Sequence, residues 1–210
     1  MCPFINKVSV MLNNLQGKKI LLGVSGGIAA YKAAELIRLL KSNGAEVRVV
    51  MTKSAMEFVQ PLTFSTLSGN SVSTEMFQQD LEVKIEHVAL ARWADAVIIA
   101  PATANVIAKL SYGLADDLLS TVCLATTAPI CIAPAMNMVM WAKEVTQNNI
   151  ELLKRRGVKV FGPASGDLAC GEIGCGKLLE PSILTEMLAG VFTKPILKGV
   201  KIIVTAGPTI

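Results

Sequence analysis

A glycine-rich turn near the N-terminus is the first feature that could hold a ligand. Ser25, Gly26 and Gly27 follow the short apolar run Lys19–Val24, and apolar residues then recur at helical spacing as far as Leu40. A turn between a strand and a helix points backbone N–H groups at an anion above it, so a phosphate is the expected ligand. The G-x-G-x-x-G and Walker A patterns are absent, which disfavours NAD and P-loop nucleotides. A tight turn that binds nothing is the alternative.

Small and polar residues also follow the next two apolar runs. Residues 52–54 (TKS) contain no carboxylate for a ribose hydroxyl, and residues 101–105 (PATAN) offer a hydroxyl and an amide. Since the carboxyl ends of parallel strands meet at one edge of a sheet, these groups suit a mononucleotide with a polyhydroxylated chain. Capping of the next helix by Thr103 and Asn105 is the plainer alternative.

Three further residues could take part in a reaction. Asn137, in the sequence PAMN, offers two donors and one acceptor, enough to orient a carboxylate or an amide. His87 is the only histidine, and Cys170 shares a glycine-rich segment with Cys175, where a thiol could close over a site as a proton donor. A helix cap, a structural histidine and incidental thiols are the alternatives. Zinc is disfavoured, because this set cannot complete a tetrahedral shell.

Composition limits the class of protein. Of 210 residues, 52% are hydrophobic and 17% are charged, which excludes a disordered chain. The net charge of +4, without a run of like charges, does not point to nucleic acid. The uncharged stretch 118–142 is broken by prolines and polar residues, so no membrane span is expected. An odd number of cysteines and the lack of a signal-like start indicate a reduced, cytoplasmic protein.

Strands that alternate with helices predict the fold. We expect right-handed βαβ units that form a Rossmann-like three-layer α/β/α sandwich with a mainly parallel sheet. The expected strands are 19–24, 46–51, 96–100, 130–133 and 158–161, and the expected helices are 28–40, 55–60, 61–68, 104–110, 117–125, 139–156 and 181–191. Segments 69–84 and 162–179 are expected to be irregular, and 200–205 reads as a further strand.

Taken together, these segments resemble the flavin-containing cysteine decarboxylase family. The resemblance is carried by SGGIAAYK at 25–32, EHVALARWAD at 86–95, APATANVIAKLSYGLADDLLST at 100–121, PAMNMVMW at 134–141 and ACGEIGCGK at 169–177. It implies an extension at 1–16 and an FMN-binding decarboxylase domain at 17–192. Residues 193–210 resemble a linker and the first strand of a CTP-dependent phosphopantothenoylcysteine synthetase domain. The chain is therefore similar to the decarboxylase half of a bifunctional protein.

The resemblance also implies the cofactor and the site residues. FMN would be held without a covalent link, and the family places its catalytic residues at His87, Asn137 and Cys170. Asn137, Met136 and Lys177 would bind the substrate. The implied FMN contacts are Ser25, Gly26, Gly27, Ile28, Thr52, Lys53, Ser54, Thr103, Ala104, Asn105, Val106 and Ala135.

The implied reaction is a carboxy-lyase step of coenzyme A biosynthesis. 4′-Phosphopantothenoylcysteine is decarboxylated to 4′-phosphopantetheine through a thioaldehyde, with hydride returned from reduced FMN. His87 would act as a base or hydrogen-bond partner, Asn137 would orient the carboxylate, and Cys170 would protonate the enethiol. The family forms trimers, or multiples of trimers, with sites near subunit contacts. Another FMN cysteine decarboxylase and a non-catalytic, flavin-binding regulatory subunit are the alternatives.

Three residues depart from the family pattern in the cysteine motif. Glu172, Lys177 and Leu178 stand where the family usually has Asp, Arg and Met. Lysine lacks the planar two-point grip of arginine on phosphate or carboxylate. Cys175 is a further departure, and it raises the hypothesis of a disulfide with Cys170 under oxidising conditions.

Overall fold

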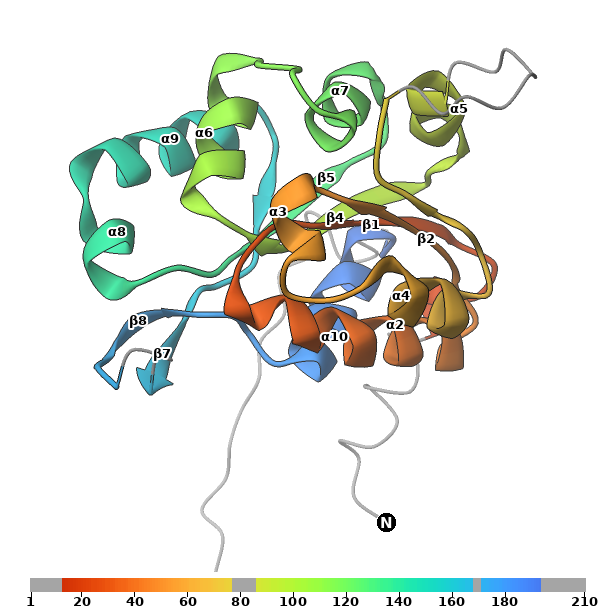
Figure 1. The fold of residues 1–210 in the computed structure, drawn as a ribbon, viewed down its shortest axis with the longest axis horizontal. Helices are drawn as coiled ribbons and strands as arrows, with labels where there is room; N and C mark the ends of the chain where they lie inside the picture. The colour runs from red at the N-terminus through yellow and green to blue at the C-terminus, as the bar shows by residue number, and fades with distance from the viewer. Residues whose placement is uncertain (1–12, 77–85, 168–170, 194–210) are drawn as a thin grey trace, which may run out of the picture.

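The computed structural model describes residues 13–76, 86–167 and 171–193 (Figure 1). Its centre is a six-stranded parallel sheet in the order β3-β2-β1-β4-β5-β6. The strands are β1 Lys19–Val24, β2 Glu46–Met51, β3 Val72–Ser73, β4 Ala96–Ala102, β5 Ile130–Pro134 and β6 Lys159–Val160. Helices cover both faces of the sheet, so the predicted Rossmann-like three-layer sandwich is confirmed.

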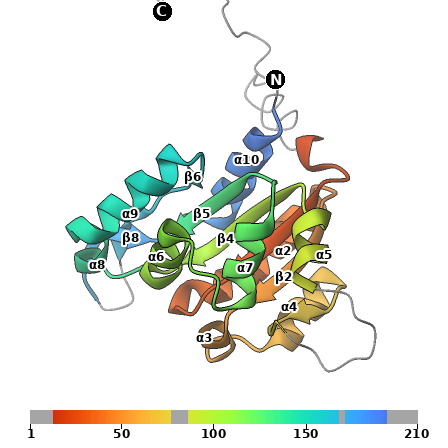
Figure 2. The same ribbon diagram turned by 90° about the horizontal axis from the view of Figure 1, so that it is seen from above.

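The helices form two layers that each bury one core (Figures 1 and 2). One layer contains α2 Lys32–Ser42, α4 Pro61–Ser68 and α10 Pro181–Val191. The other contains α5 Glu86–Trp93, α6 Ala104–Tyr112, α7 Leu118–Ala125 and α9 Glu144–Arg155. Successive residues of β4 show why both layers are needed: Ile98 packs into the first core, whereas Val97 and Ile99 pack into the second.

The strand order reverses between β1 and β4, and this reversal positions the site. The chain runs outward from β1 to β2 and β3 on one side, then returns to place β4, β5 and β6 on the other. Ligands of open α/β sheets bind in the crevice outside the strand ends at this reversal. The 3-10 turn η2, Ile28–Tyr31, and the start of α6 both lie there.

Several predicted elements have different bounds in the structure. The helix expected at 139–156 is two helices, α8 Met138–Ala142 and α9, because the backbone of Lys143 is extended between them (φ −60°, ψ 134°). The helix expected at 55–60 is α3, Lys53–Met56, and the first turn after the glycines is the 3-10 turn η2. Sequence reasoning did not predict α5, whose eight residues have a weak amphipathic pattern.

Both segments that were expected to be irregular contain strands. In 69–84, β3 pairs with β2 and extends the edge of the sheet. In 162–179, β7 Ala164–Asp167 and β8 Ile173–Lys177 form an antiparallel hairpin that lies apart from the main sheet. Its glycines serve close backbone packing, since a Cβ on Gly176 would lie 2.2 Å from the carbonyl oxygen of Met136. This explains why the strand lacks an alternating apolar pattern.

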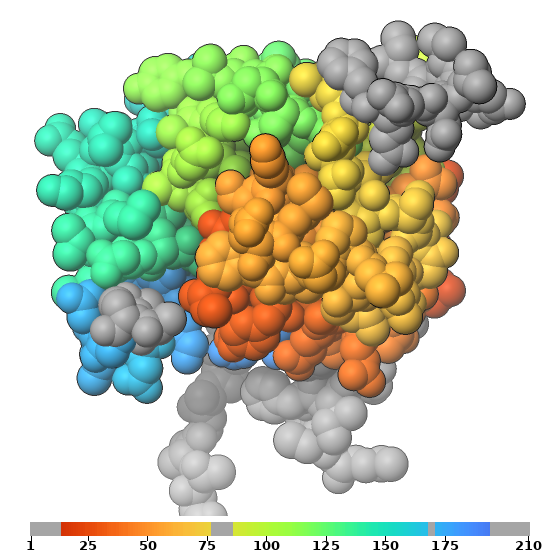
Figure 3. All heavy atoms as spheres, viewed as in Figure 1, coloured from red at the N-terminus to blue at the C-terminus, as the bar shows by residue number. Residues whose placement is uncertain are grey.

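Figure 3 shows how the folded chain brings distant segments together: the blue hairpin lies beside the red residues that follow β1. The stretch 118–142 forms α7, β5 and α8 rather than one continuous helix. Among the helices that the structure describes, none is both long and apolar enough to cross a membrane. Residues 1–12 of the extension expected at 1–16, and the strand expected at 200–205, lie outside the described residues.

Candidate active site

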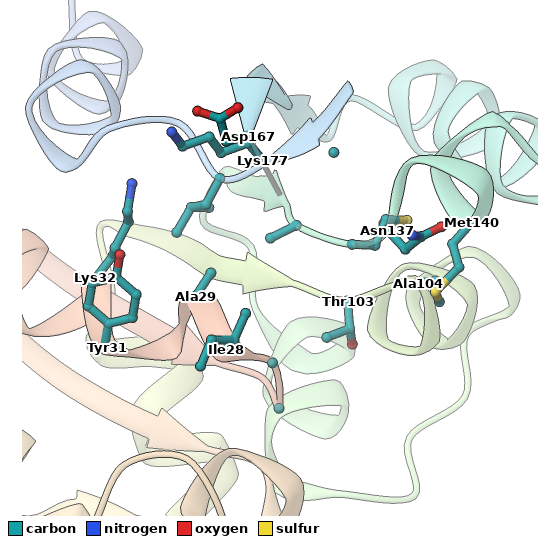
Figure 4. Close-up of a pocket in the computed structure, with 16 residues that line it drawn as sticks. Ile28, Ala29, Tyr31, Lys32, Thr103, Ala104, Asn137, Met140, Asp167 and Lys177 are labelled. Carbon is teal, nitrogen blue, oxygen red and sulfur yellow. The ribbon is translucent and has the colours of Figure 1, made fainter. Parts of the chain in front are cut away.

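A cavity of about 640 Å³ opens at the strand reversal (Figure 4). Its walls come from the glycine turn, the start of α2, the start of α6, the loop before α8 and the β7–β8 hairpin. This volume lies within the range of small-molecule and cofactor sites. The cavity therefore lies where the fold predicts a ligand.

Ser25 fastens the two loops that form the floor of the cavity. Its side chain is buried, its Oγ donates a hydrogen bond to the carbonyl oxygen of Pro101 (2.7 Å), and it accepts one from the N–H of Thr103 (3.1 Å). The Ser25 N–H also donates to the same carbonyl oxygen (3.3 Å). Ser25 does not line the cavity, and this geometry makes it a positioning residue for the glycine turn.

Gly26 allows the turn to approach the start of α3. A Cβ at this position would lie 2.4 Å from Cβ of Ser54 and 2.7 Å from its carbonyl carbon, closer than real Cβ contacts. Beside this contact, Thr52 Oγ1 is buried and has no hydrogen-bond partner within the described part of the chain. Buried hydroxyls rarely lack a partner, so Thr52 Oγ1 is a candidate to hydrogen-bond a ligand atom. Gly26, Gly27 and Ile28 line the cavity, whereas residues 52–54 do not.

Thr103 both caps a helix and faces the cavity. Its Oγ1 accepts a hydrogen bond from the N–H of Val106 (3.4 Å) at the start of α6, the role that the plainer interpretation expected. Thr103 and Ala104 line the cavity. Asn105 is exposed and Val106 is buried, and neither lines it.

Asn137 is held firmly at the opposite wall. Its Oδ1 accepts a hydrogen bond from the N–H of Val139 (2.8 Å), which caps α8, and its Nδ2 donates to Glu172 Oε2 (3.0 Å). Ala135, Met136 and Asn137 all line the cavity. The residue is thus both a helix cap and a cavity wall, and a side chain fixed at two points is well placed to orient a ligand.

The structure does not bring two of the predicted catalytic residues, His87 and Asn137, together within one chain. His87 lies half-buried on the first turn of α5 and does not line the cavity. Helix α5 packs against α7, and both views place it far from α8 and the hairpin (Figures 1 and 2). A hydrogen bond from Ser73 Oγ to Glu86 Oε1 ties α5 to the sheet edge. Cys170 lies outside the described residues.

Sequence reasoning missed several cavity residues, of which Lys32 is the most polar. It is the first residue of α2, its side chain is 13% exposed, and its Nζ lies 2.8 Å from Glu180 Oε1. The hydrogen bond from Lys32 holds the pKa of Glu180 below its usual value. The only signal was its place at the end of SGGIAAYK. Tyr31, Met140 and Asp167 were also missed.

The buried thiols do not belong to the site. Burial raises the pKa of Cys123 and of Cys131 to about 12, so both are neutral at pH 7 and chemically inert. Neither lines the cavity. Within residues 13–76, 86–167 and 171–193, no group of three His, Cys, Asp or Glu side chains is placed to hold a metal ion.

Comparison with known proteins places the chain in a family. Residues 9–193 match the Flavoprotein family. The chain belongs to this family. The bifunctional coenzyme A biosynthesis protein CoaBC of Vibrio parahaemolyticus is 50% identical over 198 residues, which are 94% of this chain and 50% of that protein. The CoaBC protein of Haemophilus influenzae is 52% identical over 93% of this chain and 49% of its own length. The chain thus spans about half the length of these relatives.

Solved structures show the same fold. A PPC decarboxylase mutant in complex with pantothenoylaminoethenethiol is 31% identical, with a TM-score of 0.76 over 84% of this chain and 99% of that chain.

The cavity residues fit a flavin nucleotide. The glycine turn supplies amides for a phosphate, and Thr103 supplies a hydroxyl group in the cavity wall. Thr52 does not line the cavity, but its buried Oγ1 has no hydrogen-bond partner among the described residues. The side chains of Ile28, Ala29 and Met140 supply apolar surface for a flat ring. Polar and apolar groups are therefore placed as such a ligand requires.

Proposed function

We propose that this chain catalyses the FMN-dependent decarboxylation of 4′-phosphopantothenoylcysteine to 4′-phosphopantetheine, a step of coenzyme A biosynthesis. The observation that carries the proposal is the shared cavity: the glycine turn and the doubly held Asn137 face the same space. The 31% identity to a PPC decarboxylase over 99% of that chain supports the substrate. The names of the curated relatives, which are bifunctional proteins of coenzyme A biosynthesis, support the pathway and a second activity in a longer protein. We propose that this second activity is the CTP-dependent synthetase.

FMN, when bound, supplies a ring that can accept a hydride from the sulfur-bearing carbon of the substrate and give it back. The reaction therefore needs no external oxidant. The residues of this chain bind the cofactor, orient the substrate and shield the site from water. The amides of Gly26 and Gly27 bind phosphate, and the Asn137 side chain orients the substrate carboxylate over the apolar wall. Exclusion of water from that wall favours loss of neutral carbon dioxide. We assign to Cys170 Sγ the proton that the enethiol carbon receives. A proton-donating thiol suits the reducing cytoplasm, where we place the enzyme.

We also propose that the enzyme assembles as a trimer, or as a multiple of trimers, and that His87 reaches the cavity of a neighbouring copy. The position of α5, away from its own cavity, supports this arrangement. Exposed apolar side chains support it too, including Ile28 at the cavity rim (60% exposed), Phe58 (49%) and Leu62 (75%). Surfaces of this kind are typical of protein–protein contacts.

The first test is direct. Purified protein should show flavin absorbance bands, and addition of 4′-phosphopantothenoylcysteine should release carbon dioxide and a product with the mass of phosphopantetheine. Asn137→Ala should keep the flavin bands and lose turnover. Turnover only of peptides that end in cysteine would contradict the proposed substrate, and failure to bind FMN would contradict the site assignment.

The shared site is tested by complementation. His87→Asn and Asn137→Ala should each be inactive alone, whereas their co-expressed mixture should regain about a quarter of wild-type activity by random assembly of shared sites. Light scattering gives the mass of each assembly. If intact trimers of the mixture stay inactive, His87 does not act across the subunit contact.

A further inference from the structure

One face of strand β8 packs along the loop that carries Asn137. Gly174 and Gly176 are two positions apart on the strand, so they share this face. A Cβ on Gly174 would lie 2.5 Å from Sδ of Met138. A Cβ on Gly176 would lie 2.2 Å from the carbonyl oxygen of Met136, whose N–H donates a hydrogen bond to the Gly176 carbonyl oxygen (2.9 Å). Both views place β8 beside α8 (Figures 1 and 2), and the strand lies against both neighbours of Asn137.

Glu172 continues this face by one more alternation. It is the residue before β8, two positions from Gly174, and its Oε2 accepts a hydrogen bond from Nδ2 of Asn137 (3.0 Å). The other two residues of this face are glycines, so Glu172 is the position on it that carries a side chain. Asn137 lines the cavity, whereas Glu172 is exposed and does not line it. Glu172 therefore acts on a ligand in the cavity through Asn137.

Two hydrogen bonds hold opposite ends of the Asn137 amide. Its Oδ1 accepts from the N–H of Val139 (2.8 Å), and its Nδ2 donates to Glu172. The helix cap by itself fixes only the oxygen end. Because an amide group is planar, two held atoms also set the direction in which each N–H of Nδ2 points. The bond to Glu172 thus contributes to the orientation of the donor that meets the substrate carboxylate.

We propose that Glu172 is a positioning residue for the decarboxylation: by accepting a hydrogen bond from Nδ2, it aligns Asn137 with the carboxylate that leaves the substrate as carbon dioxide. The inference rests on the proposed function. It requires of position 172 an acceptor atom at this distance and no negative charge. Glutamine has the same length as glutamate and keeps an acceptor oxygen, whereas alanine removes the acceptor.

The expected kinetic consequence is a loss in the alanine variant that glutamine rescues. Glu172→Ala should lower kcat/KM for 4′-phosphopantothenoylcysteine about 10-fold, because a small misplacement of an orienting group is enough for a loss of this size. Glu172→Gln should stay within about threefold of wild type, since it still accepts from Nδ2. Both variants should keep the flavin bands and the wild-type melting temperature, because Glu172 is exposed and belongs to neither core.

Calorimetric titration of the FMN-loaded enzyme separates positioning from a general loosening of the hairpin. One probe is 4′-phosphopantothenoylserine, which keeps the carboxylate but has no sulfur to react, and the other is 4′-phosphopantetheine, which lacks the carboxylate. In Glu172→Ala the serine analogue should bind about 10-fold more weakly, and phosphopantetheine should bind as in wild type. In an Asn137→Ala background, Glu172→Ala should change the binding of neither probe, because its effect passes through Asn137.

Ile173→Ala is the matched control within the hairpin. Ile173 adjoins Glu172 in the chain, points to the opposite face of the strand, is 76% exposed and does not line the cavity. This variant should keep the wild-type kcat/KM and the wild-type affinity for both probes.

Each other outcome overturns a stated part. Equal losses in Glu172→Gln and Glu172→Ala would assign the effect to charge and contradict the acceptor role. Weaker binding of both probes by Glu172→Ala, or an equal loss in Ile173→Ala, would mean that position 172 only supports the hairpin. Wild-type kinetics in Glu172→Ala would overturn the positioning role while the proposed function stood. A wild-type enzyme that releases no carbon dioxide from 4′-phosphopantothenoylcysteine would overturn the proposed function, and the role of Glu172 with it.

Discussion

Asp117 connects helices α6 and α7, and its replacement should lower the free energy of unfolding. Its Oδ1 accepts a hydrogen bond from the N–H of Ser120 (2.8 Å) and caps α7, while its Oδ2 lies 2.8 Å from Nζ of Lys109 on α6. Ser120 Oγ returns a hydrogen bond to the same carboxylate (2.9 Å). Helix α6 is capped by Thr103 in the cavity wall, so this contact also supports the site.

The magnitude follows from two losses. Removal of an N-cap costs about 1 kcal/mol, and loss of a partly buried, charge-assisted hydrogen bond costs about 1–2 kcal/mol more. We therefore expect Asp117→Ala to lower the free energy of unfolding by about 2–3 kcal/mol. Asp117→Asn keeps a cap acceptor and should cost about 1 kcal/mol.

Acidification should reduce the difference in the free energy of unfolding between wild type and the Asp117 variants. Burial alone would raise the pKa of Asp117, but hydrogen bonds from Lys109 and Ser120 outweigh it and hold the pKa below the ordinary value of 3.8. Since the folded-state pKa is lower than the unfolded one, ionised Asp117 stabilises the fold above about pH 4. The contribution is lost as pH falls through the folded-state pKa. The stability gap between wild type and Asp117→Asn should therefore narrow on acidification.

Urea unfolding, followed by circular dichroism at pH 7 and at pH 3.5 at one fixed protein concentration, measures both effects. Asp116→Ala is the matched control: it removes the neighbouring carboxylate, which also contacts Lys109 (2.7 Å) but is 65% exposed and caps nothing. It should cost no more than about 0.5 kcal/mol. Equal losses for Asp116→Ala and Asp117→Ala, or a gap that widens in acid, would refute this reasoning.

Two further predictions concern the glycine turn and the thiols. Gly26→Ala should lose bound flavin and have a lower melting temperature, because its methyl group would meet Ser54. Gly27→Ala should keep the wild-type melting temperature, since the nearest atom to its methyl group would be 3.8 Å away. Thermal unfolding and flavin absorbance measure both effects. In the native protein at pH 8, Cys123 and Cys131 should resist iodoacetamide, because burial raises their pKa to about 12. Peptide mapping checks this, and labelling of either thiol before global unfolding would contradict the burial argument.

The central strands are predictable from sequence because both of their faces are buried. Strands β1 and β2 have the predicted bounds, since a parallel strand between two helix layers is a continuous run of apolar residues. The hairpin could not be predicted in this way. Its strands are rich in glycine and pack by their backbone against the loop before α8, which leaves no apolar alternation.

Some features of the site are likewise predictable from sequence, and others are not. The glycine turn and Asn137 are recognisable because their residue types follow strands, where open sheets bind ligands. The pairing of Lys32 with Glu180 joins residues 148 positions apart, and it depends on the packing of α10 against α2. The distance of His87 from the cavity follows from the packing of α5 against α7, which a local pattern does not encode.

Because the hairpin lies apart from the main sheet, folding and substrate recognition depend on different parts of the molecule. The hairpin strands contribute no residue to either core, yet they line one end of the cavity. Glu172, the residue before β8, accepts a hydrogen bond from Asn137. Mutations there can change which molecule is accepted without endangering the folding of the sheet. Gly176 is the limit to this freedom, because its close contact with Met136 excludes any larger residue. We therefore expect relatives to diversify their substrates mainly in this hairpin, while the glycine turn and the strand ends stay the same.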